Sequence, residues 1–122
     1  MERLPSSVRT DYGKKLESIG LSFWQWDNYW KEDVCYRFSS AQIDELEAAT
    51  IELHSMCIAA AEYAIRHNRL DSLKIPPMFH NAIKSSFAKN EFSLYGRFDL
   101  AYDGVKPPKM LEYNADTPTI QF

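Results

Sequence analysis

SSAQIDELEAATIELHSMCIAAAEYAIRH, residues 39–67, is the stretch that decides the fold. Ser39 stands three residues before Gln42, which is the spacing of a capping box at the start of a helix. Small or apolar side chains then recur at helical spacing, at Ile43, Leu46, Thr50, Leu53, Cys57, Ala60 and Ala64. The pattern predicts one long helix from about Ala41 to about His67.

Shorter helices are expected on both sides of this one. Asp11 can cap a short helix ahead of it, and Gly20 can end that helix. After the long helix, Pro77 fits the first position of another helix, which we expect to end near Asn90.

The period changes from helical to two near residue 92. FSLYGRFDLAYDG (residues 92–104) alternates as a strand does and closes on the turn signal Asp103-Gly104. KMLEYNA (residues 109–115) follows as a second strand. We expect an antiparallel pair joined by an irregular loop, and the fold class predicted for this span is therefore α+β.

Four polar side chains would meet if these strands pair with matching faces. Arg97 and Asp99 are two residues apart and share a face, as do Glu112 and Asn114 on the second strand. The oxygens of Asp, Glu and Asn suit a hard cation such as Mg²⁺, and a guanidinium beside them can hold a carboxylate or phosphate. That combination suits phosphoryl transfer. A solvated, ion-paired face, with Arg97 bound to Glu112 and no ligand, explains the same pattern, and patterning alone favours it.

Composition excludes several classes of protein. The 122 residues suit one domain or a piece of a larger one, and 45% hydrophobic with 25% charged residues is globular rather than disordered. A net charge of −3 gives no sequence-wide footprint for nucleic acid or anionic lipid. No stretch is apolar enough to span a bilayer or to act as a signal peptide, so we expect a cytoplasmic protein with no membrane partner.

An aromatic cluster and three histidines offer further candidates. LSFWQWDNYW (residues 21–30) can pack in a core or act as a lid over a site, whereas its acidic neighbours disfavour nucleic acid. His54, His67 and His80 lack the spacing of zinc ligands, so structural or surface roles are expected for them.

Short segments along nearly the whole chain resemble, in order, the glutathionylspermidine synthase family. They are GLSF (residues 20–23), YWKED (29–33), YRFS (36–39), IDELEAA (43–49), LHSM (53–56), YGRFD (95–99) and LEYNADTPT (111–119). The resemblance implies an ATP-grasp ligase that joins a carboxylate to an amine. ATP first phosphorylates the carboxylate, and the amine then displaces the phosphate. In the founding enzymes the glycine carboxylate of glutathione is joined to spermidine.

The resemblance also assigns roles to residues of this chain. It implies that Asp99, Glu112 and Asn114 bind Mg²⁺. It further implies that Arg97 is catalytic and contacts ATP, because it steadies the transferring phosphate and the acyl phosphate. The loop after the second strand can contact the peptide substrate, although a turn explains its composition equally well; its candidates are Asp116, Thr117 and Thr119.

The family's catalytic domain is several times longer than this chain. Residues 1–122 are therefore expected to form the N-terminal part of a pre-ATP-grasp/ATP-grasp domain, truncated after the E-x-N motif. The lysines and glycine-rich loop that hold ATP would lie beyond Phe122. The expected substrates are a glutathione-like carboxylate and a polyamine or other amine. The alternative is a non-catalytic α+β fragment that acts as a binding or dimerising module, with self-association through an exposed strand edge.

Overall fold

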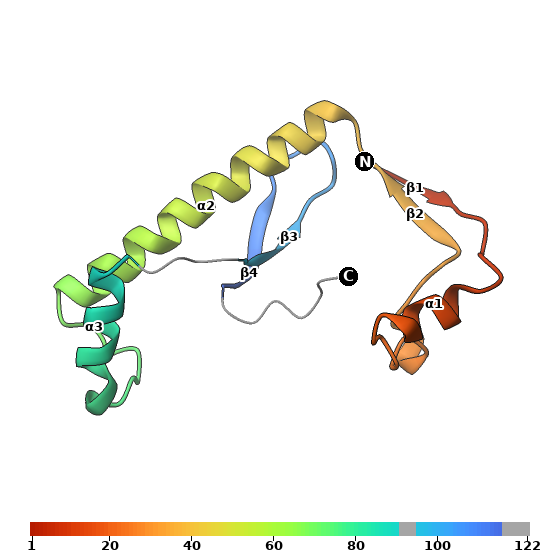
Figure 1. Cartoon of the computed structure of the whole chain (residues 1–122). Coiled ribbons are helices and arrows are strands. Elements are labelled where there is room, and N and C mark those ends of the chain that lie inside the picture. Colours follow the sequence, from red (N-terminus) through yellow and green to blue (C-terminus); the bar gives the residue numbers. More distant parts are fainter. Residues whose placement is uncertain (91–94, 116–122) are drawn as a thin grey trace.

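A long central helix organises the chain in the computed structural model, which describes residues 1–90 and 95–115. This helix, α2 (Ser40–Arg66), has the other elements placed along it (Figure 1). Ser39 forms the predicted capping box. The Gln42 N–H donates to Ser39 Oγ at 3.3 Å, and the Ser39 N–H donates to Gln42 Oε1 at 3.0 Å. The predicted helix and its start are therefore confirmed.

Residues ahead of α2 form a small unit of their own. It contains β1 (Glu2–Pro5), α1 (Tyr12–Ser18), the 3₁₀ turn η1 (Trp26–Asn28) and β2 (Val34–Arg37). Strands β1 and β2 pair antiparallel, with Leu4 opposite Cys35. This pair was not predicted, because the strands are four residues each and no turn signal joins segments so far apart.

Helix α1 begins after Asp11, as expected, but for a different reason. The Asp11 side chain makes no capping hydrogen bond; its Oδ2 pairs with Lys15 Nζ at 3.2 Å, one turn later. Ion pairs at this spacing stabilise a helix weakly.

The buried core of the described residues is small and lies in two places. Leu16 and Leu21 are 5% and 1% exposed within the N-terminal unit, and Leu70, after the end of α2, is 3% exposed. No side chain of α2 is fully buried. The long helix is thus a scaffold with partly covered faces rather than the centre of a core.

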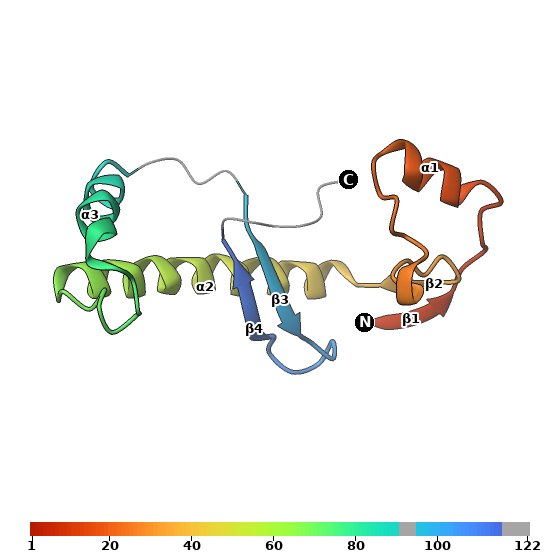
Figure 2. The same ribbon diagram turned by 90° about the horizontal axis from the view of Figure 1, so that it is seen from below.

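Helix α3 (His80–Ala88) lies at the C-terminal end of α2 (Figure 2). A 3₁₀ turn, η2 (Pro77–Phe79), leads into it, with Pro77 at its start as predicted. Ile58 and Ile65 of α2 line a groove together with Ile83 and Phe87 of α3.

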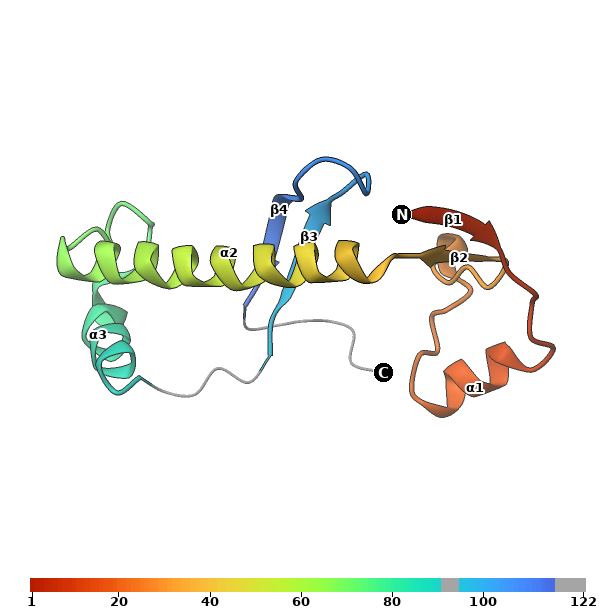
Figure 3. The same cartoon turned by 90° about the horizontal axis from the view of Figure 1, so that it is seen from above.

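The second strand pair crosses α2 as a two-stranded ribbon (Figure 3). It consists of β3 (Arg97–Ala101) and β4 (Lys109–Asn114), paired antiparallel as predicted. The turn after β3 is the expected one. Asp103 Oδ1 accepts the N–H groups of Val105 and Lys106 at 2.9 and 2.8 Å, and Gly104 takes a φ of +81°.

Three side-chain hydrogen bonds between described residues join α2 to the ribbon. Gln42 Nε2 donates to the Gly104 carbonyl at 2.9 Å, and Tyr102 Oη donates to Glu45 Oε2 at 2.6 Å. At the opposite end of the ribbon, His54 Nδ1 and Tyr113 Oη share a hydrogen bond of 2.8 Å. In the described part of the chain, no helix is both long and apolar enough to cross a lipid bilayer.

Candidate active site on the β3–β4 ribbon

The strand register brings the four predicted polar residues to one face of the ribbon. Arg97 is opposite Asn114, and Asp99 is opposite Glu112. Directly opposed residues of an antiparallel pair project from the same side, with Cβ atoms about 4.5–5.5 Å apart. The sequence condition for a shared site, that the polar faces coincide, is therefore met.

A register shift lies directly beside this set. Asp99 pairs with Glu112, but Leu100 pairs with Met110, so Leu111 has no partner across the ladder. Leu111 is 70% exposed. Strict alternation along β4 would place Leu111 on the face of Tyr113, whereas the shift places Met110 opposite Leu100. Bulges of this kind re-aim side chains and are common next to active sites.

Arg97 pairs along its own strand with Asp99. Its Nε lies 2.9 Å from Asp99 Oδ1, and its Nη2 lies 3.4 Å from Asp99 Oδ2. The expectation of an Arg97–Glu112 pair was thus wrong in its partner. Glu112 is exposed, and among the described residues its side chain makes no hydrogen bond or ion pair, so its carboxylate is open to solvent.

The donor set fits a hard cation. Asp99 and Glu112 supply carboxylates, and a carboxylate that already accepts from a guanidinium keeps lone pairs for a second partner. Asn114 Nδ2 is buried and has no hydrogen-bond partner among the described residues. Because amide orientation is assigned from the hydrogen-bond network, turning this amide by half a rotation places Oδ1, an oxygen of the kind that Mg²⁺ prefers, at that point.

No three His, Cys, Asp or Glu side chains gather as a metal site within residues 1–90 and 95–115. The ribbon set contains two carboxylates and one amide. Because Asn114 is not one of these four residue types, the set has only two members of that kind. The predicted substrate contacts Asp116, Thr117 and Thr119 lie outside the described residues and remain predictions.

Comparison with known proteins decides the family. The model of the glutathionylspermidine synthase pre-ATP-grasp family matches residues 3–122. The chain belongs to this family. The resemblance seen in the ordered motifs is therefore confirmed, as is an α+β architecture for a pre-ATP-grasp domain.

A relative of this pre-ATP-grasp domain comes from Haemophilus influenzae. The protein, named "Putative acid–amine ligase", is 38% identical over 117 residues, which cover 92% of the present chain. The matched region is 30% of the relative's own length. The chain thus spans less than a third of this longer protein.

The stacking of two rings on the back face of the ribbon in this pre-ATP-grasp domain was not predicted. Phe98 and Tyr113 are opposite one another in the register, and their rings stack at 3.9 Å with planes 13° apart. Tyr113 then reaches His54 of α2. The sequence held one usable signal: Phe98 and Tyr113 each stand between two members of the polar set, so alternation places them together on the opposite face.

A groove of about 520 Å³ lies where α2 meets the start of β3. Arg97 is the one member of the polar set that lines it. Its lining residues are Thr50, Ile51, His54, Ser55, Gly96, Arg97 and Phe98.

At the loop end of the ribbon two pKa values are displaced. The hydrogen bond to Glu45 is the main reason that the pKa of Tyr102 is raised to about 12. The N–H groups of Lys106 and Val105 lower the pKa of Asp103. Both shifts mark contacts that hold the loop, away from the polar set.

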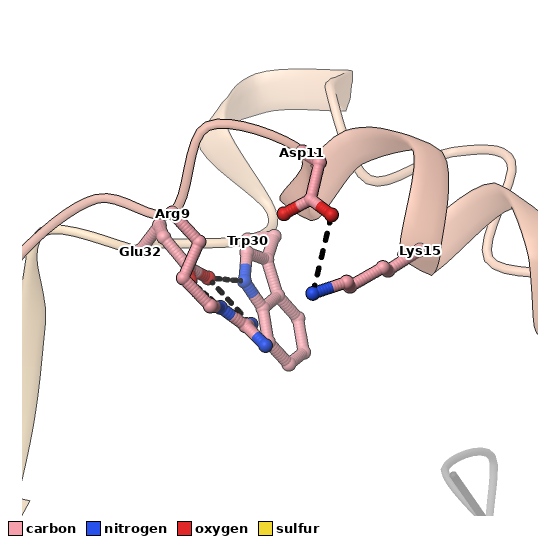
Figure 4. Close-up of polar contacts among 5 residues, drawn as sticks. All are labelled: Arg9, Asp11, Lys15, Trp30 and Glu32. Atoms are coloured by element: carbon pink, nitrogen blue, oxygen red, sulfur yellow. Dashed lines mark hydrogen bonds and ion pairs between the residues drawn. The ribbon is translucent and has the colours of Figure 1, made fainter.

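A second polar cluster belongs to the N-terminal unit rather than to the ribbon (Figure 4). Glu32 accepts two hydrogen bonds from the Arg9 guanidinium, and Trp30 Nε1 donates to Glu32 Oε2 at 2.7 Å. These bonds, from Arg9 first and Trp30 second, lower the pKa of Glu32 to about 2. The Glu32 side chain is 10% exposed. The cluster ties the segment before α1 to the segment before β2, which is a structural role.

The aromatic stretch packs partly within the same unit. Tyr12 and Trp24 make an edge-to-face contact at 5.1 Å, and Phe23 does the same with Tyr29 at 5.0 Å. Trp26 is 72% exposed. The core interpretation therefore holds for part of the cluster, and a role as a lid stays a prediction.

Proposed function

We propose that the protein is an ATP- and Mg²⁺-dependent ligase that joins a carboxylate to an amine, and that this chain supplies the metal-binding and phosphate-binding ribbon. The observation that carries the proposal is the register of β3 and β4, which places Arg97, Asp99, Glu112 and Asn114 on one face. Membership of the glutathionylspermidine synthase pre-ATP-grasp family and the name of the Haemophilus relative support the same reaction class.

The proposed reaction has two steps. A substrate carboxylate oxygen attacks the γ-phosphorus of ATP. The bond between this phosphorus and the β,γ-bridging oxygen breaks, ADP departs, and an acyl phosphate is formed. The amine nitrogen then attacks the acyl carbon and loses a proton, and the carbon–oxygen bond to phosphate breaks to give an amide and inorganic phosphate.

Residues of the ribbon have separate tasks in this scheme. Asp99, Glu112 and Asn114 would hold Mg²⁺, which neutralises phosphate charge when bound. The Arg97 guanidinium donates to the oxygens of the transferred phosphoryl group and of the acyl phosphate, where charge accumulates. Its pairing with Asp99 fixes the direction of the guanidinium before substrate arrives.

The proposed substrates are a glutathione-like carboxylate and a polyamine or another amine. Asp116, Thr117 and Thr119 would contact the peptide part of the acid. Elements that hold the adenine and the rest of ATP would come from a longer protein, as in the relative, of which this chain matches 30%.

The test is Glu112→Ala in the protein at the full length that its gene encodes. ADP release is measured with Mg²⁺, glutathione and a panel of amines, and the amide is identified by mass spectrometry. We expect the variant to lose ATP turnover by at least about 100-fold while its thermal melt is unchanged, because a metal ligand acts mainly on the charged transition state. Glu47→Ala, an exposed carboxylate on α2, is the matched control.

Near-normal turnover in Glu112→Ala would refute the metal assignment. If the full-length protein is folded but releases no ADP with any of the acid and amine pairs tested, the ligase proposal itself is contradicted.

A second candidate function rests on a different observation. Ile51, Met56 and Ile58 of α2 are 62%, 59% and 47% exposed, which is unusual for a helix at the centre of a domain. A non-catalytic binding or dimerising module would use this surface. It is favoured over the ligase if the full-length protein binds neither Mg²⁺ nor ATP.

A further inference from the structure

The polar set stands at the end of the ribbon that is farthest from its closing loop. Arg97 begins β3, and Asn114 ends β4. Strand ends fray first, since each lost ladder bond frees the next. An isolated two-stranded ribbon is only marginally stable in water, so the geometry of this end needs support from outside the ribbon.

The loop end has its support from α2 in two contacts. Tyr102 donates to Glu45 and Gln42 donates to the Gly104 carbonyl. At the other end, the side-chain hydrogen bond that links described residues of α2 and the ribbon is the one between His54 and Tyr113, at 2.8 Å. The two rings also meet edge to face, with centroids 5.9 Å apart.

Tyr113 transmits this contact to both strands. It stands between Glu112 and Asn114 in β4, and its ring stacks on Phe98, which stands between Arg97 and Asp99 in β3. A Cβ at Gly96 would lie 2.7 Å from Tyr113 Cε2 and 2.9 Å from Tyr113 Oη, so the ring lies directly against the backbone before Arg97. Both flanks of the polar set are thus fixed to one aromatic ring.

We propose that His54 is a positioning residue of this site: through Tyr113 it holds the Arg97–Asn114 end of the ribbon in register and so fixes the four polar side chains relative to one another. The expected effect on metal binding rests on the proposed function, whereas the anchoring of this end of the ribbon by His54 does not. His54 acts here through its hydrogen bond to Tyr113, which lies on the face of the ribbon opposite the polar set. Groups behind a metal site commonly change affinity by 10- to 100-fold when they are removed.

The experiment has two readouts on the protein at the full length that its gene encodes. Amide hydrogen exchange reports the opening of each end of the ribbon, and Mn²⁺ titration by electron paramagnetic resonance reports the metal site without any turnover. His54→Ala should speed exchange at residues 97–99 and 112–114 by about 5- to 10-fold, the effect of one lost hydrogen bond, and leave the loop end nearly unchanged. The same variant should weaken Mn²⁺ binding by about 10-fold.

Three further variants separate positioning from general stability. Tyr113→Phe removes the hydroxyl and keeps the stacked ring, and it should match His54→Ala; the double variant should add nothing further. His54→Asn places an amide near the position of Nδ1 and should restore both readouts. Tyr102→Phe removes the contact at the loop end and should leave Mn²⁺ affinity unchanged.

Each outcome decides the proposal. The proposal is overturned if His54→Ala speeds exchange equally at both ends of the ribbon, or if it changes nothing. It is also overturned if exchange rises only at residues 97–99 and 112–114 while Mn²⁺ affinity stays the same. Failure of His54→Asn to restore either readout would also count against it. If the wild type binds no Mn²⁺ but His54→Ala still opens this end of the ribbon, the His54–Tyr113 contact is supported and the metal site is refuted. The failure of the proposed function is thus distinguished from the failure of the structural proposal.

Discussion

Gly96, directly before β3, is a position where an added carbon would meet the Tyr113 ring. A Cβ there would enter the space of the Tyr113 ring at 2.7 Å. The ring also stacks on Phe98, and its hydroxyl bonds to His54, so both contacts restrict its movement. We expect Gly96→Ala to lower the free energy of unfolding by about 1–3 kcal/mol, the usual cost of overpacking. Urea unfolding followed by circular dichroism measures it.

A background without the ring provides the control for this change. In Tyr113→Val the added methyl group meets no aromatic side chain, so Gly96→Ala should then cost much less. An equal cost in both backgrounds would show that the strain has another source.

Glu32 gives the clearest pH dependence at the residue scale. Its folded-state pKa is lowered from 4.5 to about 2 by hydrogen bonds from Arg9 and Trp30. A depressed carboxyl pKa contributes stability that is complete above pH 4.5 and is lost as the pH falls toward 2. We expect the N-terminal unit to lose stability over this window and Glu32→Gln to flatten the dependence.

Tryptophan fluorescence during urea unfolding, at several pH values, measures this effect. All three tryptophans of the chain lie between residues 24 and 30, so the signal comes from the N-terminal unit. Glu2→Gln is the matched control: Glu2 also pairs with an arginine, Arg37, but both side chains are more than half exposed. Such pairs contribute little, so Glu2→Gln should leave the pH dependence unchanged. An unchanged pH dependence in Glu32→Gln would refute the role assigned to Glu32.

Individual site residues could be predicted from sequence only as far as alternation allows. A period of two places Arg97 with Asp99 and Glu112 with Asn114, and the register then joined the two pairs. The partner of Arg97 could not be predicted, because the choice between Asp99 and Glu112 depends on rotamers. His54 could not be linked to Tyr113 either, since nothing in a sequence states where a helix crosses a ribbon.

At the scale of elements, those whose own segment carries a start, turn or periodic signal were predicted, and those without one were missed. Helix α2 carries its own start, the Ser39 capping box, and a long periodic pattern, and it was predicted to within about a turn. The β3–β4 ribbon has alternation and an Asp-Gly turn. The β1–β2 pair has neither, because its strands are four residues each and separated by almost thirty residues of other structure.

The register shift beside Asp99 is a second element-level feature that alternation misses. A strict period of two would place Leu111 on the back face with Tyr113. The extra residue lets Met110 pair with Leu100 and keeps Glu112 opposite Asp99. The bulge therefore reconciles the spacing of the polar pair with that of the loop end of the ribbon.

The whole molecule exposes far more surface than its mass requires. Its accessible surface is 9775 Å², whereas a compact protein of 14.2 kDa exposes about 6,800 Å². The excess is comparable to the area buried in large obligate interfaces. The extended arrangement in Figure 1, with separate units at the two ends of α2, explains the difference.

This surface predicts the behaviour of the 122-residue chain when it is expressed alone. Exposed apolar side chains on α2, and ribbon edges that pair with no other strand of the described residues, both favour association with like chains. We expect size-exclusion chromatography with light scattering to give a mass above 14.2 kDa that rises with concentration, together with strong binding of a hydrophobic dye. Replacing both Ile51 and Ile58 by lysine should shift the chain toward the monomer, because charge on the helix face opposes burial, whereas lysine at exposed Val105, in the ribbon loop, should not. A single species of 14.2 kDa at every concentration, without dye binding, would mean that the uncovered face of α2 is stable in water by itself.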